Sequence, residues 1–377
     1  MPASSLADRV SRRASAVSPP PLGAGAAAFE GDAPLLEHDA IGPMASNRQT
    51  PKRTAGALIR SFYAYRTQPR AADWIKESEV TEVNRRRQSA LAAGALVVIV
   101  SAAPVCVYSA GTGVARSGFV TAPDGARIRY LENGKGPGPA LLFVPGWMMT
   151  AEIWESQMAR FAPTRHVVAI DPRAQGQSSK TTEGLYPAAR ARDLKRVVDQ
   201  LKLAPVVLIG WSMGVSEVAL FVDQFGTRDV AGIVLVDESL GGDPDPERVL
   251  AVVQWLGELQ VDRPKATADF VRSMYKRPQP DAYLLKVTRE ALATPTSAAV
   301  ALFVASIASD TGAALGKIDK PTLIVYASSA VANPAYERMQ KRIAGSRLER
   351  FERAGHALFV DEADRFNALL DEFLKGL

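Results

Sequence analysis

Residues 206–214 read VVLIGWSMG, which combines a strand-like run, a glycine-flanked turn and the start of a helical pattern. Its first four residues form an apolar run of strand length, and an apolar helical pattern follows over residues 213–225. Between the two, Gly210 and Gly214 flank Ser212 in the pattern Gly-X-Ser-X-Gly. When this pattern joins a strand to a helix, a sharp turn holds the serine oxygen above the sheet, near the positive end of the helix. The stretch therefore predicts a nucleophile elbow with Ser212 as the nucleophile.

Strand-like and helical segments alternate on both sides of this elbow. An Asp124-Gly125 turn between residues 119–121 and 127–131 predicts a β-hairpin. The further apolar runs of strand length are residues 140–144, 167–170, 206–209, 233–236 and 323–326. The helical patterns are residues 151–161, 187–201, 213–225 and 361–374. This alternation predicts an α/β fold, with a mostly parallel sheet covered by helices on both faces.

Residues 244–316 interrupt the alternation. They contain no strand-like run, but they contain helix-length segments around residues 247–259, 266–275, 281–293 and 297–309. We interpret residues 244–316 as an inserted helical cap. The cap belongs to a catalytic domain that we place at residues 117–377.

Residues 1–88 differ in composition from the rest of the chain. Their first 55 residues are rich in Ala, Ser, Pro and Gly and show no sustained periodicity, so we expect a largely disordered extension. The extension contains thirteen Lys and Arg residues against nine Asp and Glu residues. It therefore carries +4 of the chain's net charge of +5, and the catalytic domain is close to neutral. Nucleic-acid binding needs a basic face on a folded domain and is not expected.

Residues 89–110 are the membrane candidate. These 22 residues carry no charge, and Arg85 to Arg87 come just before them. Their length matches the roughly 20 residues that span a bilayer, so we expect a transmembrane helix that acts as a signal-anchor. The preceding arginines favour a catalytic domain on the exported side of the membrane, periplasmic or extracellular. Cleavage near residues 113–115 would instead release a secreted protein, and this alternative stays open.

The candidate catalytic histidine is identified by elimination among the histidines of the chain. The chain has three histidines and one cysteine, Cys106, so an intrachain disulfide is excluded. His38 lies in the extension and His166 begins a strand, whereas His356 precedes the last helix. A serine needs a base to become a nucleophile, and His356 follows Ser212 in the chain order that this elbow requires. We therefore expect His356 to be the general base, and no sequence motif indicates a metal or another cofactor.

Residues 117–377 resemble the α/β-hydrolase superfamily, especially its cofactor-free esterase and haloperoxidase-like branch. The matching stretches occur in the expected order: VPGW at 144–147, DPRAQGQS at 171–178, GWSMG at 210–214, and Gly355-His356 before the final helix. The resemblance implies an oxyanion hole formed by the backbone N–H groups of Met213 and Trp147. It also implies an architectural role for residues 171–178, in which we interpret Asp171 and Arg173 as an ion pair.

The acid of the catalytic triad departs from the family pattern. The family usually carries it after the strand that corresponds to residues 323–326. Here residues 327–334 read ASSAVANP, and Ala330 occupies the position of the aspartate. Some family members carry the acid after the preceding strand, which in this chain ends just before Asp237 and Glu238. Asp237 is the first choice for the acid and Glu238 the second, and a Ser–His dyad without an acid is the remaining alternative.

These features predict a serine esterase that cleaves a carboxylic ester through an acyl-enzyme. Ser212 attacks the carbonyl, His356 accepts the proton and Asp237 orients the imidazole, while Met213 and Trp147 bind the oxyanion. We expect a small-molecule ester as substrate, and the oligomeric state is left open. Perhydrolysis in the manner of the haloperoxidase-like enzymes, amide cleavage or lactone cleavage would use the same triad. A catalytically degenerate binding protein would explain the missing carboxylate after residue 326.

Overall fold

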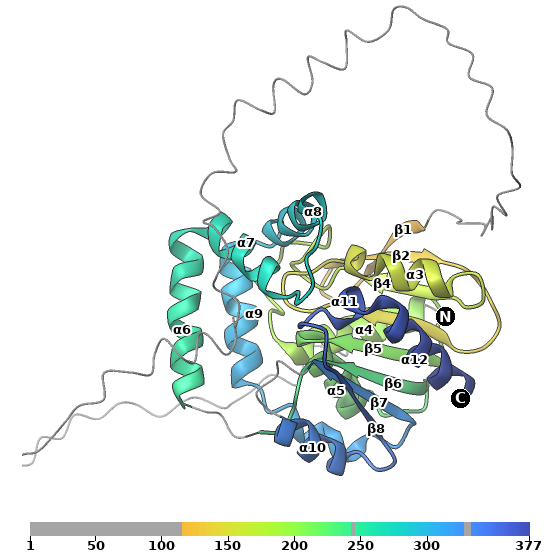
Figure 1. Cartoon of the computed structure of the whole chain (residues 1–377). Coiled ribbons are helices and arrows are strands. Elements are labelled where there is room, and N and C mark those ends of the chain that lie inside the picture. The colour runs from red at the N-terminus through yellow and green to blue at the C-terminus, as the bar shows by residue number, and fades with distance from the viewer. Residues whose placement is uncertain (1–114, 243–245, 328–332) are drawn as a thin grey trace, which may run out of the picture. The chain divides into compact units, whose positions relative to one another are not determined.

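The computed structural model describes residues 115–242, 246–327 and 333–377 (Figure 1). The predicted extension at residues 1–88 and the predicted membrane segment at residues 89–110 lie outside these ranges. Within the described ranges, no single helix is long and apolar enough to cross a membrane. The helices Asp281–Leu292 (α8) and Thr296–Ala308 (α9) meet the length and composition criteria only as a pair, and this pair is bent by 85°.

In the described part of the chain, eight strands form one sheet in the order β1-β2-β4-β3-β5-β6-β7-β8. Their bounds are Arg116–Thr121 (β1), Arg127–Asn133 (β2), Ala140–Val144 (β3), Val167–Ile170 (β4), Val206–Trp211 (β5), Val230–Val236 (β6), Thr322–Ala327 (β7) and Arg347–Phe351 (β8). β1 and β2 form the predicted hairpin, β2 also pairs antiparallel with β4, and the other neighbours are parallel. The predicted mostly parallel sheet is confirmed.

Both faces of the sheet are buried, which explains why its central strands read as continuous apolar runs. In β5, Val207 and Ile209 point into one hydrophobic core, whereas Val206 and Leu208 point into the other. The first core is completed by α3 (Glu155–Phe161) and α12 (Ala363–Lys375). The second is completed by α4 (Pro187–Gln200), α5 (Met213–Phe225) and α10 (Asn333–Arg342) (Figure 1).

The helix predicted over residues 151–161 is divided. Residues Ala151–Trp154 form a 3-10 helix (η2), and α3 begins at Glu155. Tight turns of this kind are frequent at the start of an α-helix. The predicted helical segment at residues 151–161 is thus helical throughout, with a 3-10 first turn.

Four consecutive helices occupy the insertion between β6 and β7. Their bounds are Pro246–Val261 (α6), Arg263–Ser273 (α7), Asp281–Leu292 (α8) and Thr296–Ala308 (α9), and a 3-10 helix at Gly312–Lys317 (η3) follows. Trp147, in the loop after β3, packs against aromatic rings of α6, α7 and α9. We call α6 to α9 the cap helices, because they contact the loops at the carboxyl ends of the parallel strands (Figure 1).

The strand register brings the predicted site residues to one edge of the sheet. Val144 at the end of β3 pairs with Gly210, and Trp211 at the end of β5 pairs with Val236. Ser212 and Asp237 therefore leave the sheet at neighbouring positions. Open α/β sheets bind ligands at the carboxyl ends of their strands, so this edge is where a site is expected.

Candidate active site

Ser212 occupies a strained turn between β5 and α5. Its φ of 53° and ψ of −124° lie outside the regions that a serine normally adopts. Both elbow glycines are required by space, because a Cβ on Gly210 would lie 2.5 Å from the carbonyl oxygen of Gly214, and a Cβ on Gly214 would lie 2.6 Å from that of Val144. The N–H of Ser212 donates to the carbonyl of Val236 at 2.9 Å, which ties the elbow to β6.

Asp237 and His356 form a direct pair. Oδ2 of Asp237 lies 2.7 Å from Nδ1 of His356, and the Asp237 carboxylate is only 7% exposed. The other oxygen, Oδ1, accepts hydrogen bonds from the N–H of Ala327 at 2.7 Å and from the hydroxyl of Tyr336 at 3.3 Å. Like Ser212, Asp237 has a positive φ, of 50°. Strained backbone of this kind gathers at functional sites, since only dense surrounding contacts can hold it.

The structure brings Asp237, and not Glu238, to His356. Glu238 instead accepts a hydrogen bond from the N–H of its neighbour Ser239 at 3.1 Å. Ala327, at the end of β7, supplies a backbone donor to the Asp237 carboxylate. The end of β7, where the resemblance places the acid, therefore contacts the Asp237 carboxylate through a backbone N–H.

The loop that carries His356 is fixed from both sides. On the sheet side, the indole N–H of Trp211 donates to the carbonyl of His356 at 2.9 Å, and the two rings lie 5.1 Å apart. On the cap side, the N–H of Ala357 donates to the carbonyl of Met274 at 2.9 Å. A Cβ on Gly355 would lie 2.6 Å from the same carbonyl oxygen, so only glycine fits there. No sequence pattern indicates the contact between Trp211 and His356, because it joins a strand end to a loop 145 residues further along the chain.

The loop after β3 lies against Ser212. A Cβ on Gly146 would stand 3.0 Å from Cβ of Ser212 and 3.4 Å from its Oγ. In the described part of the chain, neither the backbone N–H of Trp147 nor that of Met213 donates to another protein group. Two unpaired backbone donors beside a serine are what an oxyanion hole requires.

The indole of Trp147 is part of an aromatic cluster beneath the cap. Its ring lies 5.2 Å from those of Trp255 and Phe270 and 5.0 Å from that of Phe303. Its N–H donates to the carbonyl of Ala299 at 2.8 Å, and the residue is 3% exposed. The side chain of Trp147 therefore anchors the cap helices to the same loop whose backbone faces Ser212.

Asp171 and Arg173 do not pair with each other, which corrects the expected ion pair. Asp171 contacts Arg129 at 3.1 Å, whereas Nη2 of Arg173 contacts Asp193 at 2.7 Å, with Asp124 as a second partner. The two side chains, separated by one residue, leave the loop toward partners on different elements. Burial raises the pKa of Asp171, and the positive charge of Arg129 acts against that rise.

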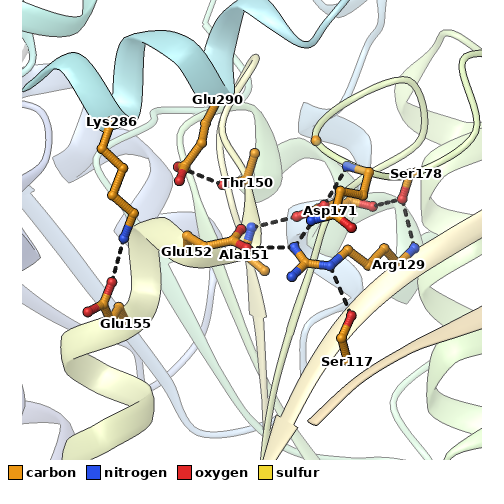
Figure 2. A network of polar contacts seen from close by, with 12 residues as sticks. Ser117, Arg129, Thr150, Ala151, Glu152, Glu155, Asp171, Ser178, Lys286 and Glu290 are labelled. Carbon is orange, nitrogen blue, oxygen red and sulfur yellow. Dashed lines mark hydrogen bonds and ion pairs between the residues drawn. The ribbon is translucent and has the colours of Figure 1, made fainter. Parts of the chain in front are cut away.

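A polar network connects this region to the cap (Figure 2). Arg129 lies between Asp171 and Glu152, and the hydroxyl of Thr150 donates to Glu290 of α8 at 3.0 Å. The pKa of Glu290 is raised by burial, although the hydrogen bond from Thr150 acts in the opposite direction. A cavity of about 410 Å³ lies beside these groups, but Ser212, Asp237 and His356 are not among its lining residues. It is therefore distinct from the candidate active site.

His166 pairs with Glu132 of β2 at 2.8 Å, and the cavity that it lines shares no residue with the triad candidates. Among the described residues, no group of three or more His, Cys, Asp or Glu side chains is arranged to hold a metal ion.

A serine on a strand–turn–helix elbow, beside a His–Asp pair at the carboxyl edge of a mostly parallel sheet, defines the α/β-hydrolases as a class of protein. The chain matches the alpha/beta hydrolase family over residues 141–369. It therefore belongs to this family and is an enzyme of the hydrolase type.

Several known proteins are similar to the chain. The esterase from Exiguobacterium antarcticum superposes with a TM-score of 0.64 at 26% identity, over 68% of this chain and 98% of that one. The pimeloyl-[acyl-carrier protein] methyl ester esterase of Neisseria meningitidis is 27% identical over 247 residues, which are 62% of this chain and 76% of that protein. The bifunctional esterase/perhydrolase of Acinetobacter calcoaceticus is 34% identical over 120 residues, or 32% of this chain and 44% of that protein.

Proposed function

We propose that the protein is a serine esterase that cleaves a carboxylic ester through an acyl-enzyme on Ser212. The observation that carries this proposal is the 2.7 Å contact between Asp237 and His356, on the sheet edge from which the Ser212 elbow emerges. Similarity to esterases supports the same reaction class. A catalytically degenerate binding protein is the less supported alternative. It rested on the missing carboxylate after residue 326, and Asp237 provides a carboxylate at His356.

Acylation uses the two nitrogens of His356 differently. Asp237 accepts the hydrogen on Nδ1, so Nε2 keeps its lone pair and takes the proton from Ser212. Oγ of Ser212 then bonds to the ester carbonyl carbon. The N–H groups of Trp147 and Met213 stabilise the oxyanion, and one such donor is worth about 3 kcal/mol. The C–O bond of the ester breaks, and His356 delivers its proton to the departing alcohol.

Deacylation repeats these steps with water. His356 takes a proton from water, and the hydroxide bonds to the acyl carbon. The bond to Oγ of Ser212 breaks, and the proton returns to the serine. The products are one carboxylic acid and one alcohol.

Perhydrolysis is a second candidate, favoured by the similarity to the bifunctional esterase/perhydrolase. In this reaction hydrogen peroxide replaces water as the group that attacks the acyl-enzyme. The acyl carbon then bonds to a peroxide oxygen, and a peracid leaves. The triad residues keep the same roles, so product analysis with and without peroxide separates the two reactions.

Fluorophosphonate labelling of the full-length protein tests the proposed function. We expect the wild type to be labelled and to hydrolyse p-nitrophenyl acetate, and Ser212→Ala to lose both properties while keeping its circular dichroism spectrum. Ser216→Ala is the matched control, because Ser216 is buried in α5, one helical turn further on. A folded wild type that neither labels nor hydrolyses short esters would refute the proposal.

We also propose that residues 89–110 attach the enzyme to a membrane, with the catalytic domain on the exported side. The charge-free segment after Arg85 to Arg87 supports this location. Fractionation of cells that express the full chain tests it, with protease added to intact cells or spheroplasts. Protection of the catalytic domain from external protease would overturn the exported orientation, and a soluble exported form beginning near residue 115 would indicate cleavage.

A further inference from the structure

The loop beside Ser212 contains a strained turn. The N–H of Met149 donates to the carbonyl of Gly146 at 3.2 Å, and Met148 inside this turn has a φ of 61°. A turn with a positive φ at its third residue normally has glycine or asparagine there. A long side chain in this conformation is unfavourable, so surrounding contacts must hold the turn in place.

The side chain of Gln175 binds three backbone groups of this turn. Its Nε2 donates to the carbonyl of Gly146 at 3.0 Å and to that of Met149 at 2.7 Å. Its Oε1 accepts the N–H of Met148 at 3.1 Å. Gln175 is 0% exposed, so water cannot replace it. One buried amide thus holds the turn 146–149 in its strained shape.

The same loop is held at its other end. The N–H of Ala151 donates to Oδ1 of Asp171 at 2.8 Å, and Arg129 holds the second oxygen of that carboxylate (Figure 2). Asp171 and Gln175 both belong to the segment after β4. The segment after β4 therefore holds residues 146–151 through side-chain hydrogen bonds to their backbone. The indole of Trp147 connects the same loop to the cap helices.

We infer that Gln175 is a positioning residue, which holds the backbone N–H of Trp147 where it stabilises the oxyanion. This inference rests on the proposed function. Trp147 lies in the turn between Gly146 and Met148, whose polar backbone groups both bind Gln175. Because Gln175 fixes the peptides on both sides of Trp147, it also fixes the direction of the Trp147 N–H. Because Gln175 is fully buried, it acts through the backbone of the turn and not on the substrate directly.

The substitution Gln175→Glu tests this role with little change in shape. A carboxylate can still accept the N–H of Met148, but it cannot donate to the carbonyls of Gly146 and Met149. Loss of one oxyanion donor lowers kcat by roughly 10²–10³-fold, so a displaced donor is expected to lower kcat by about 10- to 10³-fold. KM is expected to change by less than about threefold, because the oxyanion develops only in the transition state. The affinity for a boronic acid, which forms a tetrahedral adduct with the serine, is expected to fall with kcat.

A double-mutant cycle with Met148→Gly distinguishes positioning from general stability. Glycine adopts a positive φ at little cost, so the turn depends less on Gln175 in that background. We expect Gln175→Glu to reduce kcat clearly less in Met148→Gly than in the wild type. Gln157→Glu is the matched control, because Gln157 is also 0% exposed and donates to the carbonyl of Phe359. It is expected to lower the melting temperature without lowering kcat.

The experiments distinguish failure of the inference about Gln175 from failure of the proposed function. A folded Gln175→Glu enzyme with wild-type kcat and wild-type boronate affinity overturns the inference, even if Met148→Gly fails to fold. Equal loss of kcat in both backgrounds overturns it as well. A wild type that is inert toward esters and fluorophosphonates refutes the proposed function, and the inference falls with it. Active wild type with an unaffected Gln175→Glu refutes the inference alone.

Discussion

Oδ2 of Asp237 lies 2.7 Å from Nδ1 of His356, although 119 positions separate the two residues in the sequence. Asp237 follows β6, and His356 precedes the short helix Leu358–Asp361 (α11). Ala327, at the end of the next strand, donates its N–H to the remaining oxygen of Asp237. The ends of two neighbouring strands, β6 and β7, therefore meet at this carboxylate, one through its side chain and the other through its backbone.

Asp237→Asn is expected to lower kcat by up to about 10⁴-fold with little change in KM. An amide at this position no longer stabilises the imidazolium and favours the wrong tautomer of His356. Steady-state kinetics on p-nitrophenyl esters measure the effect. Fluorophosphonate labelling is expected to slow in parallel, because it depends on the same activated serine.

Glu238→Gln is the control for this prediction. It changes the neighbouring carboxylate, which bonds to the N–H of Ser239, and it is expected to keep kcat within about threefold of the wild type. Equal losses in the two variants would show that the negative charge of the segment, rather than the contact with His356, is what matters. Full activity of Asp237→Asn would instead support a Ser–His dyad.

Tyr336→Phe is expected to have a much smaller effect than Asp237→Asn. The tyrosine hydroxyl lies 3.3 Å from Oδ1 of Asp237, whereas the N–H of Ala327 lies at 2.7 Å and remains in the variant. Loss of one hydrogen bond to a charged group is worth about 1.5–3 kcal/mol, and the long distance places this bond at or below the lower end. We expect kcat to fall by less than about tenfold, and a loss of 10³-fold would contradict this ranking of the two donors.

Trp211→Phe is expected to lower kcat by about tenfold, because it leaves the carbonyl of His356 without its indole donor. Trp154→Phe is the matched control. Both tryptophans are almost completely buried and both pack against Phe359, but Nε1 of Trp154 has no hydrogen-bond partner among the described residues. Kinetics and thermal melting of both variants check the prediction. Equal losses of kcat would mean that packing around Phe359, and not the hydrogen bond, positions His356.

The sequence predicted the parts of the site that depend on chain order and strand ends. Ser212 follows from a Gly-X-Ser-X-Gly pattern between a strand and a helix, and His356 from its place before the last helix. Asp237 follows from the family resemblance, because some members carry the acid after the strand that corresponds to β6. The structure places all three residues at one edge of the sheet, and their catalytic roles stay predictions until the variants are measured.

The contacts that the sequence could not predict join side chains to distant backbone groups. Gln175 was visible in the stretch DPRAQGQS, but nothing in its pattern indicates which carbonyls its amide meets. The expected pairing of Asp171 with Arg173 failed for a related reason. Arg129 on β2 lies close to Asp171 because β2 pairs with β4, and Asp171 directly follows β4. The distance between the two residues along the sequence does not reveal this contact.

The helix α5, which begins directly after Ser212, contains a buried carboxylate. Glu217 lies in α5, one helical turn after Met213, and its carboxylate is 2.9 Å from the guanidinium of Arg190. Neither side chain is more than 1% exposed. Burial raises the pKa of Glu217 to about 7, although the charge of Arg190 acts in the opposite direction.

This raised pKa makes the stability of the protein depend on pH. Between about pH 4.5, where an exposed glutamate titrates, and about pH 7, the folded state holds a proton on Glu217 that the unfolded chain has lost. The contribution of this group to the free energy of unfolding is therefore full below that window and decreases as the pH rises through it, by on the order of 1–3 kcal/mol. Glu217→Gln removes this contribution. Urea unfolding of both proteins between pH 5 and pH 8 should show the advantage of the wild type over the variant shrinking with pH. Asp223→Asn, at the surface of the same helix, should keep the wild-type slope, and an advantage that grows with pH would show that Glu217 is ionised throughout and held by Arg190.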